Sequence, residues 1–493
     1  MGLKEKVIKG ASWSIISQIS VQVLSVGVTI VLARLLNPED FGVVTISEIF
    51  VGFAYLFADL GMGAAIIQRQ TTDDNALATS FWVTVIMGLG ITLVLCAGSP
   101  LIAGFYDRPI LQYIVMLSSA GFLIGSLTSI HKSILARKLE FNKIALINIT
   151  SRLISGVTSI GMAVLGFGVW SLVAGSLAGQ ALVVPMVWYV ARWRPRLLFH
   201  KQCFKDMFGF SSNLLAFNFF NYFARNADNL IIGKVLGAQI LGYYSLAYNV
   251  MLKPLQYISW SVGNVLFPAL SSIQNDKELV RRVYLRIVRS ISLITFPMMA
   301  GLMIVSKEVV LTFYGPKWEP AILPLQLLCV VGAMQSIGTT VGTVFISQGR
   351  SDLQLKWGVF ASCVYLVAFV VGVQWGLIGL IMLYVAAGVP LWPLSHYVAN
   401  RLIKLDMKTF CQAMIPATTA SALMAISLLF LKYMNRQTFE LGVYSALTVF
   451  VIIGMILNVL FLQLMFRVQE VEEAKKFLRK KITAYMEPSA KVT

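Results

Sequence analysis

Residues 11–42 read ASWSIISQISVQVLSVGVTIVLARLLNPEDFG, an apolar stretch that ends in a polar turn. Residues 11–33 are long enough to cross a membrane, since a transmembrane helix needs about 20 mostly apolar residues. Asn37 precedes Pro38 at the end of the stretch, and a proline disfavours helical backbone in the residue before it. The stretch is too long for a cleavable signal peptide and has no small-residue cleavage site, so we expect it to be retained.

Comparable stretches recur along the whole chain, about fourteen in all. They lie near 11–33, 41–67, 77–104, 110–131, 144–166, 169–191, 208–233, 240–265, 284–305, 321–346, 357–374, 376–399, 411–431 and 441–465. The composition agrees, because 57% of the residues are apolar, 13% are charged and the mean hydropathy is +0.77. A soluble domain has about 25% charged residues. The sequence therefore predicts an all-α polytopic membrane protein and excludes a soluble enzyme.

The net charge of +18 comes from 40 basic and 22 acidic residues. A nucleic-acid-binding protein could carry that charge, but it could not expose so much apolar surface to water. We therefore expect no nucleic acid as a partner. With the loops assigned to alternate sides and the N-terminus inside, the inner side holds about four times as many Lys and Arg residues as the outer side. This asymmetry predicts that both termini are cytoplasmic.

An internal repeat links the first and seventh stretches at an offset of about 200 residues. Leu32-Ala-Arg-Leu-Leu-Asn-Pro-Glu-Asp-Phe-Gly42 aligns with Ile232-Gly-Lys-Val-Leu-Gly-Ala-Gln-Ile-Leu-Gly242. Two further matches follow in the same order, Phe105-Tyr-Asp with Phe313-Tyr-Gly and Gly168-Val-Trp-Ser-Leu172 with Gly376-Leu-Ile-Gly-Leu380. Six helices per copy is an even number, so the copies are parallel repeats with the substrate path between them.

This repeat predicts how the chain is divided. We expect an N-terminal six-helix lobe over 1–191, a basic cytoplasmic linker over 192–206, a C-terminal six-helix lobe over 207–400, two additional transmembrane helices over 401–466 and a basic cytoplasmic tail over 467–493. The tail has apolar residues near one helical face, which is typical of a helix lying on anionic lipids of the inner leaflet. A solvated tail is the alternative.

A stripe of polar residues follows the seventh stretch. Asn218, Asn221, Arg225 and Asp228 are spaced by three, four and three residues, which places them on one helical face. Such a face cannot contact lipid, because a charged group at the bilayer centre costs about 2.5–3.5 kcal/mol on insertion scales. It therefore faces a wet cavity or another helix. The alternative for Arg225 and Asp228 is a structural ion pair three residues apart.

Similar polar residues occur in other stretches, and we expect them to line the same cavity. The candidates are Gln18 and Gln22 in the first, Arg152 in the fifth, Asn249, Lys253 and Gln256 in the eighth, and Arg289 in the ninth. For Arg289 the alternative is a side chain that extends to the cytoplasmic surface. Basic residues outnumber acidic ones in these stretches, so the cavity suits an anion, and a guanidinium matches phosphate oxygens well.

Three acidic residues within the stretches could bind a coupling ion, H⁺ or Na⁺. They are Glu48, Asp59 and Asp228. Pairing with nearby basic residues, or helix capping, is the alternative for each. The five cysteines and three histidines are dispersed, and neither a nucleophile–base cluster nor a G-x-x-x-x-G-K-[ST] loop occurs. We therefore expect no catalytic residue, no metal site and no cofactor.

Several short motifs together resemble those of the polysaccharide flippases of the multidrug/oligosaccharidyl-lipid/polysaccharide exporter superfamily, and most of all the colanic-acid-type exporters. They are Lys9-Gly-Ala-Ser-Trp-Ser14, the Leu32–Gly42 segment, Asp59-Leu-Gly61, Ile67-Gln-Arg69, Asn226-Ala-Asp228, Ile232-Gly233, Leu236-Gly237 and Val265-Leu-Phe-Pro-Ala269. The likeness covers nearly the whole chain and is weakest in the last two stretches and the tail.

The resemblance implies a bacterial inner-membrane protein that flips an undecaprenyl-pyrophosphate-linked oligosaccharide to the periplasmic leaflet. It implies alternating access of two lobes around a cationic cavity, and a polysaccharide polymerase and chain-length machinery as partners. The alternatives are another exporter of the superfamily, for peptidoglycan precursors or drugs, and a membrane-embedded polymerase. A cationic drug would need an acidic cavity, and a polymerase would need a large periplasmic loop, which the sequence lacks.

Overall fold

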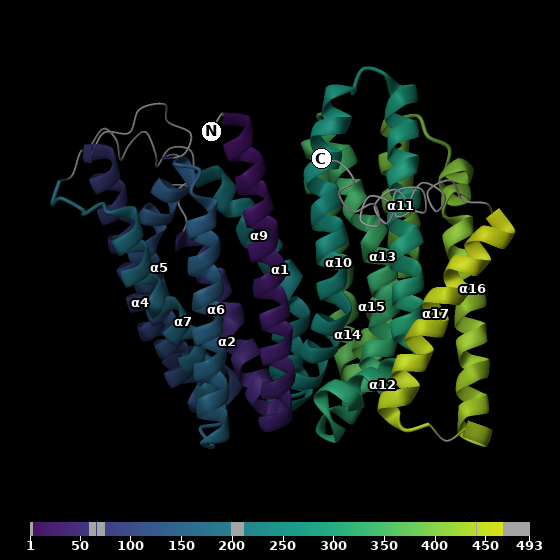
Figure 1. Cartoon of the computed structure of the whole chain (residues 1–493), viewed down its shortest axis with the longest axis horizontal. Helices are drawn as coiled ribbons and strands as arrows, with labels where there is room; N and C mark the ends of the chain where they lie inside the picture. The colour runs from purple at the N-terminus through teal and green to yellow at the C-terminus, as the bar shows by residue number, and fades with distance from the viewer. Residues whose placement is uncertain (1–2, 59–65, 67–73, 199–211, 440, 467–493) are drawn as a thin grey trace, which may run out of the picture. The chain divides into compact units, whose positions relative to one another are not determined.

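The computed structural model describes residues 3–58, 66, 74–198, 212–439 and 441–466, and these contain helices and no strand (Figure 1). The chain divides into two compact units, the first Met1–Ser245 and the second Leu246–Thr493. Each unit is a bundle of long helices. The predicted all-α fold is therefore confirmed for the described residues.

The first unit contains α1 (Leu3–Leu35), α2 (Pro38–Ala58), α4 (Asp74–Tyr106), α5 (Ile110–Arg137), α6 (Phe141–Val164), α7 (Trp170–Ala191), α9 (Ser212–Val235) and the start of α10 (Ala238–Ser272). The second unit contains the rest of α10, then α11 (Lys277–Ile304), α12 (Ser306–Val309), η1 (Val310–Tyr314), η2 (Pro316–Ala321), α13 (Ile322–Ser347), α14 (Ser351–Gly372), η3 (Val373–Trp375), α15 (Gly376–Leu402), α16 (Met407–Met434), η4 (Asn435–Phe439) and α17 (Val443–Phe466).

Each predicted apolar stretch overlaps one of the long helices, although the helices often extend beyond it. Ten segments of the described residues are long and apolar enough to cross a membrane, and one of them, Ser351–Leu402, spans both α14 and α15. Helices α2, α9 and α10 are not among the ten. Helix α9, for example, carries Arg225, Asp228 and Lys234. The protein is thus a multi-pass membrane protein, and the count of fourteen crossings stays a prediction.

The boundary between the two units falls inside α10, between Ser245 and Leu246. That division follows contacts, whereas the predicted lobe boundaries follow the sequence repeat, so the lobes at 1–191 and 207–400 stay a prediction. Of the predicted linker, residues 192–198 are described and the remainder lies outside the described residues. The predicted surface helix of the tail also lies outside them.

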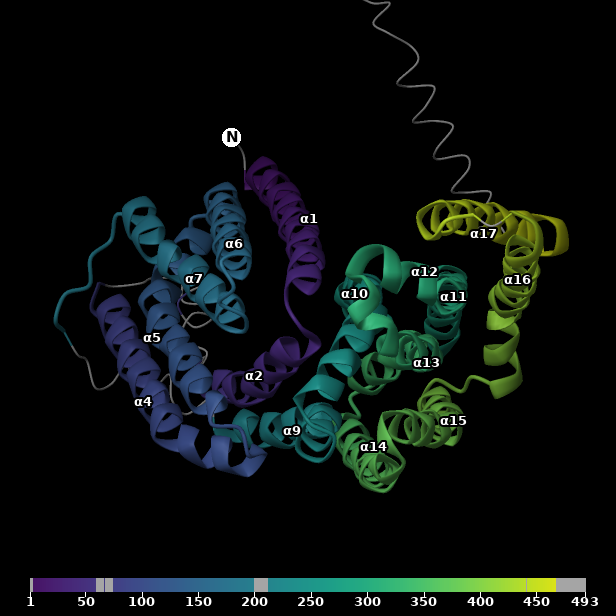
Figure 2. The same cartoon turned by 90° about the horizontal axis from the view of Figure 1, so that it is seen from below.

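The order of helix packing is the same in both units. In the first unit α4 packs on α5, α5 on α7 and α6 on α7; in the second unit α11 packs on α13, α13 on α15 and α14 on α15 (Figure 2). These are the helices that the repeat aligns. Helix α1 also packs along α6, and α2 packs against α5 and α9.

The aligned positions also share an unusual backbone conformation. Asp107 and Gly315 have φ angles of 54° and 94°, and Gly168 and Gly376 have φ angles of 54° and 73°. Left-handed backbone is strained for most L-residues, which is why glycine occupies three of these four positions and Asp, one of the tolerated residues, the fourth. The repeat therefore holds at the turns between helices, where individual sequence matches were weak.

Two aligned glycines exchange contacts where α2 and α10 begin. A Cβ added to Gly42 would lie 1.7 Å from the carbonyl oxygen of Ala238, and one added to Gly242 would lie 1.9 Å from the carbonyl oxygen of Pro38. Each helix thus packs through its glycine onto the first residue of the other. Only glycine allows backbone to approach backbone so closely. Ion pairs lie beside this crossing, from Lys234 to Asp107 at 2.9 Å and from Arg108 to Glu39.

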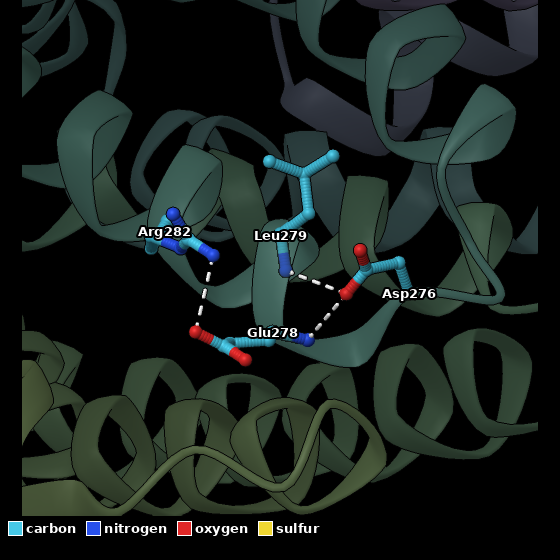
Figure 3. A network of polar contacts seen from close by, with 4 residues as sticks. All are labelled: Asp276, Glu278, Leu279 and Arg282. Atoms are coloured by element: carbon cyan, nitrogen blue, oxygen red, sulfur yellow. Dashed lines mark hydrogen bonds and ion pairs between the residues drawn. The ribbon is translucent and has the colours of Figure 1, made fainter.

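In the second unit, α11 begins with a side-chain cap, and α16, which lies beyond the repeat, packs along it. Helix α11 begins at Asp276, whose carboxylate accepts the backbone N–H of Glu278 at 3.1 Å and of Leu279 at 3.0 Å (Figure 3). Such a side-chain cap satisfies donors that the first helical turn leaves open. Helix α16 packs along α11, with the Phe410 ring stacked 6.1 Å from Tyr284. Lys432 of α16 donates to Glu308 at 2.9 Å and to the Ile304 carbonyl at 2.8 Å.

Substituting either crossing glycine with alanine should destabilise the first unit. A methyl group at position 42 or 242 would overlap a carbonyl oxygen, and overpacking of this kind costs about 1–3 kcal/mol. We expect Gly42→Ala and Gly242→Ala to lower the unfolding temperature in detergent. Gly104→Ala is the matched control, because nothing lies within 4 Å of its added Cβ. Equal stability of the three variants would contradict the close approach.

Candidate functional site

Helix α9, which carries the longest predicted polar stripe, is fixed to α2 by aromatic residues. The Tyr222 hydroxyl donates to the Ile49 carbonyl at 2.7 Å, and the Phe53 ring lies 4.8 Å from that of Phe223. Gly52 leaves room for this contact, because a Cβ there would lie 2.4 Å from the Tyr222 hydroxyl. The tyrosine contact therefore sets which face of α9 remains for the charged residues.

Asp228 is buried, at 6% exposure, and faces the start of α10. Its carboxylate accepts the Tyr244 hydroxyl at 2.6 Å and the Asn229 backbone N–H at 2.8 Å. Tyr244 is itself fully buried. A buried charge is tolerated when hydrogen bonds replace its water, so this carboxylate links α9 to α10 within the first unit.

Arg225 is exposed and forms no ion pair with Asp228 in the described part of α9. The structural ion pair that we gave as an alternative is therefore wrong, since Tyr244 occupies the carboxylate. The side chains of Asn218 and Asn221 lie outside the described residues. The two charged residues of the stripe thus lie in different surroundings: the Asp228 carboxylate is buried and the Arg225 guanidinium is exposed.

Arg152 lies on α6, half-buried, and its Nε is buried with no hydrogen-bond partner in the described structure. The neighbouring small residues of α6 face α7. Ser151 donates to the Gly179 carbonyl at 2.8 Å, and a Cβ at Gly175 would lie 1.8 Å from the Ser159 hydroxyl oxygen. Small residues of this kind let membrane helices approach closely. This part of the polar face therefore belongs to a helix contact and not to a cavity.

Gln22 and Arg152 lie at the same level of the first unit. A Cβ at Gly10 would lie 2.6 Å from Phe141, and one at Gly156 would lie 2.5 Å from Val28, so α1 and α6 run parallel. This register sets Arg152 beside residues 21–24 of α1. Gln22 is half-buried and Gln18, one turn earlier, is exposed. Gln22 and Arg152 therefore share a level along the pair of helices, and Gln18 lies one turn away from that level.

The second unit holds the remaining basic candidates. On α10, Asn249 and Gln256 are exposed and Lys253 is half-buried, whereas Met251 and Leu255 are buried. The polar residues thus share a face that the bundle leaves open. Arg289 of α11 is half-buried. Each unit is described by itself, so the cavity between the lobes stays a prediction.

A polar group in the second unit was missed from the sequence. The Gln335 side-chain amide donates to the Tyr384 hydroxyl at 3.0 Å and lies 3.5 Å from the Tyr248 hydroxyl. These residues come from α13, α15 and α10. Isolated Gln and Tyr residues in apolar helices show no spacing pattern that would reveal such a group. The one indication in the sequence was that Tyr248 lies next to Asn249, a residue already predicted to face the cavity.

The three acidic candidates lie in different surroundings. Asp228 is buried against Tyr244, and Glu48 of α2 is exposed, while Asp59 lies outside the described residues. A buried carboxylate with a hydroxyl donor can hold or release a proton when its surroundings change. Among the described residues, no group of three or more His, Cys, Asp or Glu residues is placed to hold a metal ion.

Comparisons with known proteins find a matching family, similar sequences and a similar fold. The sequence pattern of the family described as "Polysaccharide biosynthesis protein" matches residues 31–323. The lipopolysaccharide biosynthesis protein WzxC of Escherichia coli (strain K12) is 32% identical over 81% of this chain and 82% of its own length. The teichuronic acid biosynthesis protein TuaB of Bacillus subtilis (strain 168) is 26% identical over 86% and 88%. Among solved structures, the lipid II flippase MurJ matches 93% of this chain and 99% of its own, with a TM-score of 0.73 and 17% identity. That structure shows the fold alone.

The Asp228–Tyr244 hydrogen bond should contribute measurably to stability. Tyr244→Phe removes the donor and leaves a buried carboxylate with one partner fewer, which costs about 1–3 kcal/mol. Asp228→Asn should cost less, because its amide oxygen still accepts one of the two hydrogen bonds and no charge is left buried. Thermal unfolding of the purified variants in detergent checks the order. If Tyr244→Phe were as stable as the parent protein, the bond would not hold α10 on α9.

Proposed function

Because the chain belongs to the family of polysaccharide biosynthesis proteins, we propose that it is a flippase for lipid-linked oligosaccharides. Its substrate would be an undecaprenyl-pyrophosphate-linked repeat unit, moved from the cytoplasmic to the periplasmic leaflet for exopolysaccharide or lipopolysaccharide synthesis. The names of the relatives support this assignment, since WzxC and TuaB are named for polymer biosynthesis and MurJ for flipping a lipid. In this proposal the chain is a transporter and not an enzyme.

The observation that carries the proposal is a half-buried arginine on an apolar helix, Arg152, whose Nε has no partner in the described structure. A guanidinium left without a carboxylate inside a membrane protein is costly unless it faces water or an anion. Arg225 and Lys253 are further basic residues on helices. Together they would neutralise a pyrophosphate, because Arg offers forked donors and Lys a point charge.

The amide side chains fit the sugar part of the substrate. Gln22 lies level with Arg152, and Asn249 and Gln256 share a face with Lys253. Amides both donate and accept hydrogen bonds, as sugar hydroxyls do. We place the pyrophosphate near the basic residues and the oligosaccharide along these amides, together with Gln18, Asn218 and Asn221. Arg289 would extend the positive surface.

The repeated packing within each of the two units supports alternating access as the mechanism, as in other transporters with parallel repeats. Glu48, Asp59 and Asp228 are the candidates for coupling this motion to H⁺ or Na⁺. We place the protein in the bacterial inner membrane with both termini cytoplasmic. A polysaccharide polymerase, chain-length machinery and anionic lipids would be its partners.

Deletion of the gene should leave the lipid-linked repeat unit on the cytoplasmic leaflet. Leaflet position can be measured by labelling the sugar in spheroplasts and in inverted membrane vesicles with an impermeant reagent. A flippase defect gives label only in inverted vesicles. Repeat units labelled in spheroplasts would contradict flipping and would favour a polymerase.

Removing single basic residues should strongly reduce export without loss of folded protein. We expect Arg152→Ala, Arg225→Ala and Lys253→Ala each to lower the export rate at least about tenfold, which corresponds to about 1.4 kcal/mol. Arg282→Ala is the control, because Arg282 forms an exposed ion pair with Glu278 at 3.1 Å, worth about 0.3–0.5 kcal/mol. Membrane levels of each variant are measured alongside. Full export by the first three variants would end the cationic-cavity hypothesis.

A further inference from the structure

The chain leaves α7 through five residues that lie outside any helix, Arg192-Trp-Arg-Pro-Arg196, here called the arginine strap. Arg192 has a φ angle of 53°, which turns the backbone away from the helix axis. Pro195 disfavours helical backbone at Arg194. Exposure then alternates along the strap, since its three arginines are exposed whereas Trp193 and Pro195 are half-buried. The strap therefore exposes its three arginines while Trp193 and Pro195 are partly covered.

Aromatic side chains fix the strap to the first unit. The Trp193 ring lies 5.3 Å from His131 and 6.0 Å from Phe81, and its Nε1 donates to Asp74 at 3.4 Å. Trp82 Nε1 donates to the Arg196 carbonyl at 2.9 Å. The backbone that carries the arginines is thus held at two points, on α4 and α5.

The arginines themselves have no carboxylate partner among the described residues. Arg194 lies 5.2 Å from the centroid of the Trp188 ring, a cation–π contact that orients the guanidinium without neutralising it. Some basic residues elsewhere do pair with acidic ones, as Lys143 does with Glu140 and Arg350 with Asp352. Three exposed arginines on a fixed backbone, none of them in an ion pair within the described structure, suit an anion even though the Asp74 carboxylate lies against Trp193.

The position of the strap indicates where that anion comes from. The strap follows a membrane-length helix and lies at the end of the first unit where α1 begins, the end predicted to be cytoplasmic (Figure 1). Leu197, directly after it, is 85% exposed, and Leu198 is 43% exposed. Exposed leucines beside exposed arginines match the boundary between acyl chains and headgroups.

We propose that the arginine strap is a binding site for the phosphate headgroup of an anionic phospholipid of the inner leaflet. The guanidinium groups hydrogen-bond the headgroup oxygens, and Leu197 and Leu198 contact the acyl chains. The aromatic side chains hold the strap in place before the lipid binds, so less conformational freedom is lost on binding. The site is separate from the flippase residues and does not depend on the proposed function.

Native mass spectrometry of the full-length protein with added phosphatidylglycerol tests the site. The variant Arg192→Gln/Arg194→Gln/Arg196→Gln should bind this lipid at least about fivefold more weakly than the parent. The matched control Arg401→Gln/Lys404→Gln/Lys408→Gln removes three exposed charges from another predicted cytoplasmic loop and should change binding less than about twofold. Equal weakening in both variants would overturn the proposal in favour of diffuse surface charge.

A second variant tests whether the strap is held in place beforehand. Trp82→Phe keeps every positive charge but removes the donor to the Arg196 carbonyl. We expect about twofold to threefold weaker phosphatidylglycerol binding and unchanged phosphatidylcholine binding. Unchanged phosphatidylglycerol binding would contradict a fixed strap. Undecaprenyl pyrophosphate serves as the competing ligand, and a strap variant that lost this lipid but kept phosphatidylglycerol would assign the strap to the substrate and overturn the proposal.

Discussion

A charged side chain on an apolar helix must face water, a ligand or a polar partner, and this constraint accounts for where the unusual residues of the chain lie. Asp228 meets it with the Tyr244 hydroxyl, and Lys432 meets it with Glu308 and a backbone carbonyl. Those residues hold helices together within a unit. Arg152, whose Nε has no protein partner in the described structure, is not explained in this way, which is why the proposed substrate site is built on it.

The close backbone contacts at Gly42 and Gly242 explain why the first unit ends inside α10. Because Gly42 packs on the first residue of α10 and Gly242 on the first residue of α2, the start of α10 is part of the first unit although most of that helix belongs to the second. Asp228 then joins α9 to the same part of α10. The exchange is reciprocal, as two copies of one motif facing each other require.

The sequence alone predicted the helices and the correspondence of Gly42 with Gly242, because apolar length and repeat spacing are local properties. It could not predict that each glycine contacts the start of the other helix. A polar stripe shows which residues share a face but not what that face meets. Ser159, two turns after Arg152 on α6, packs on Gly175, and Asp228 pairs with a tyrosine sixteen residues later. A tyrosine in an apolar helix has no distinguishing pattern.

The strap arginines and Arg152 differ in how much water surrounds their charge. On the strap, water solvates the exposed guanidinium groups, so a bound phosphate must replace that water and gains mainly from their fixed positions. Arg152 has already lost part of its water through burial, so an anion beside it would be attracted more strongly than in bulk water. The substrate of the proposed flippase must also be released. Release from a half-buried cation costs less than release from a fully buried cluster.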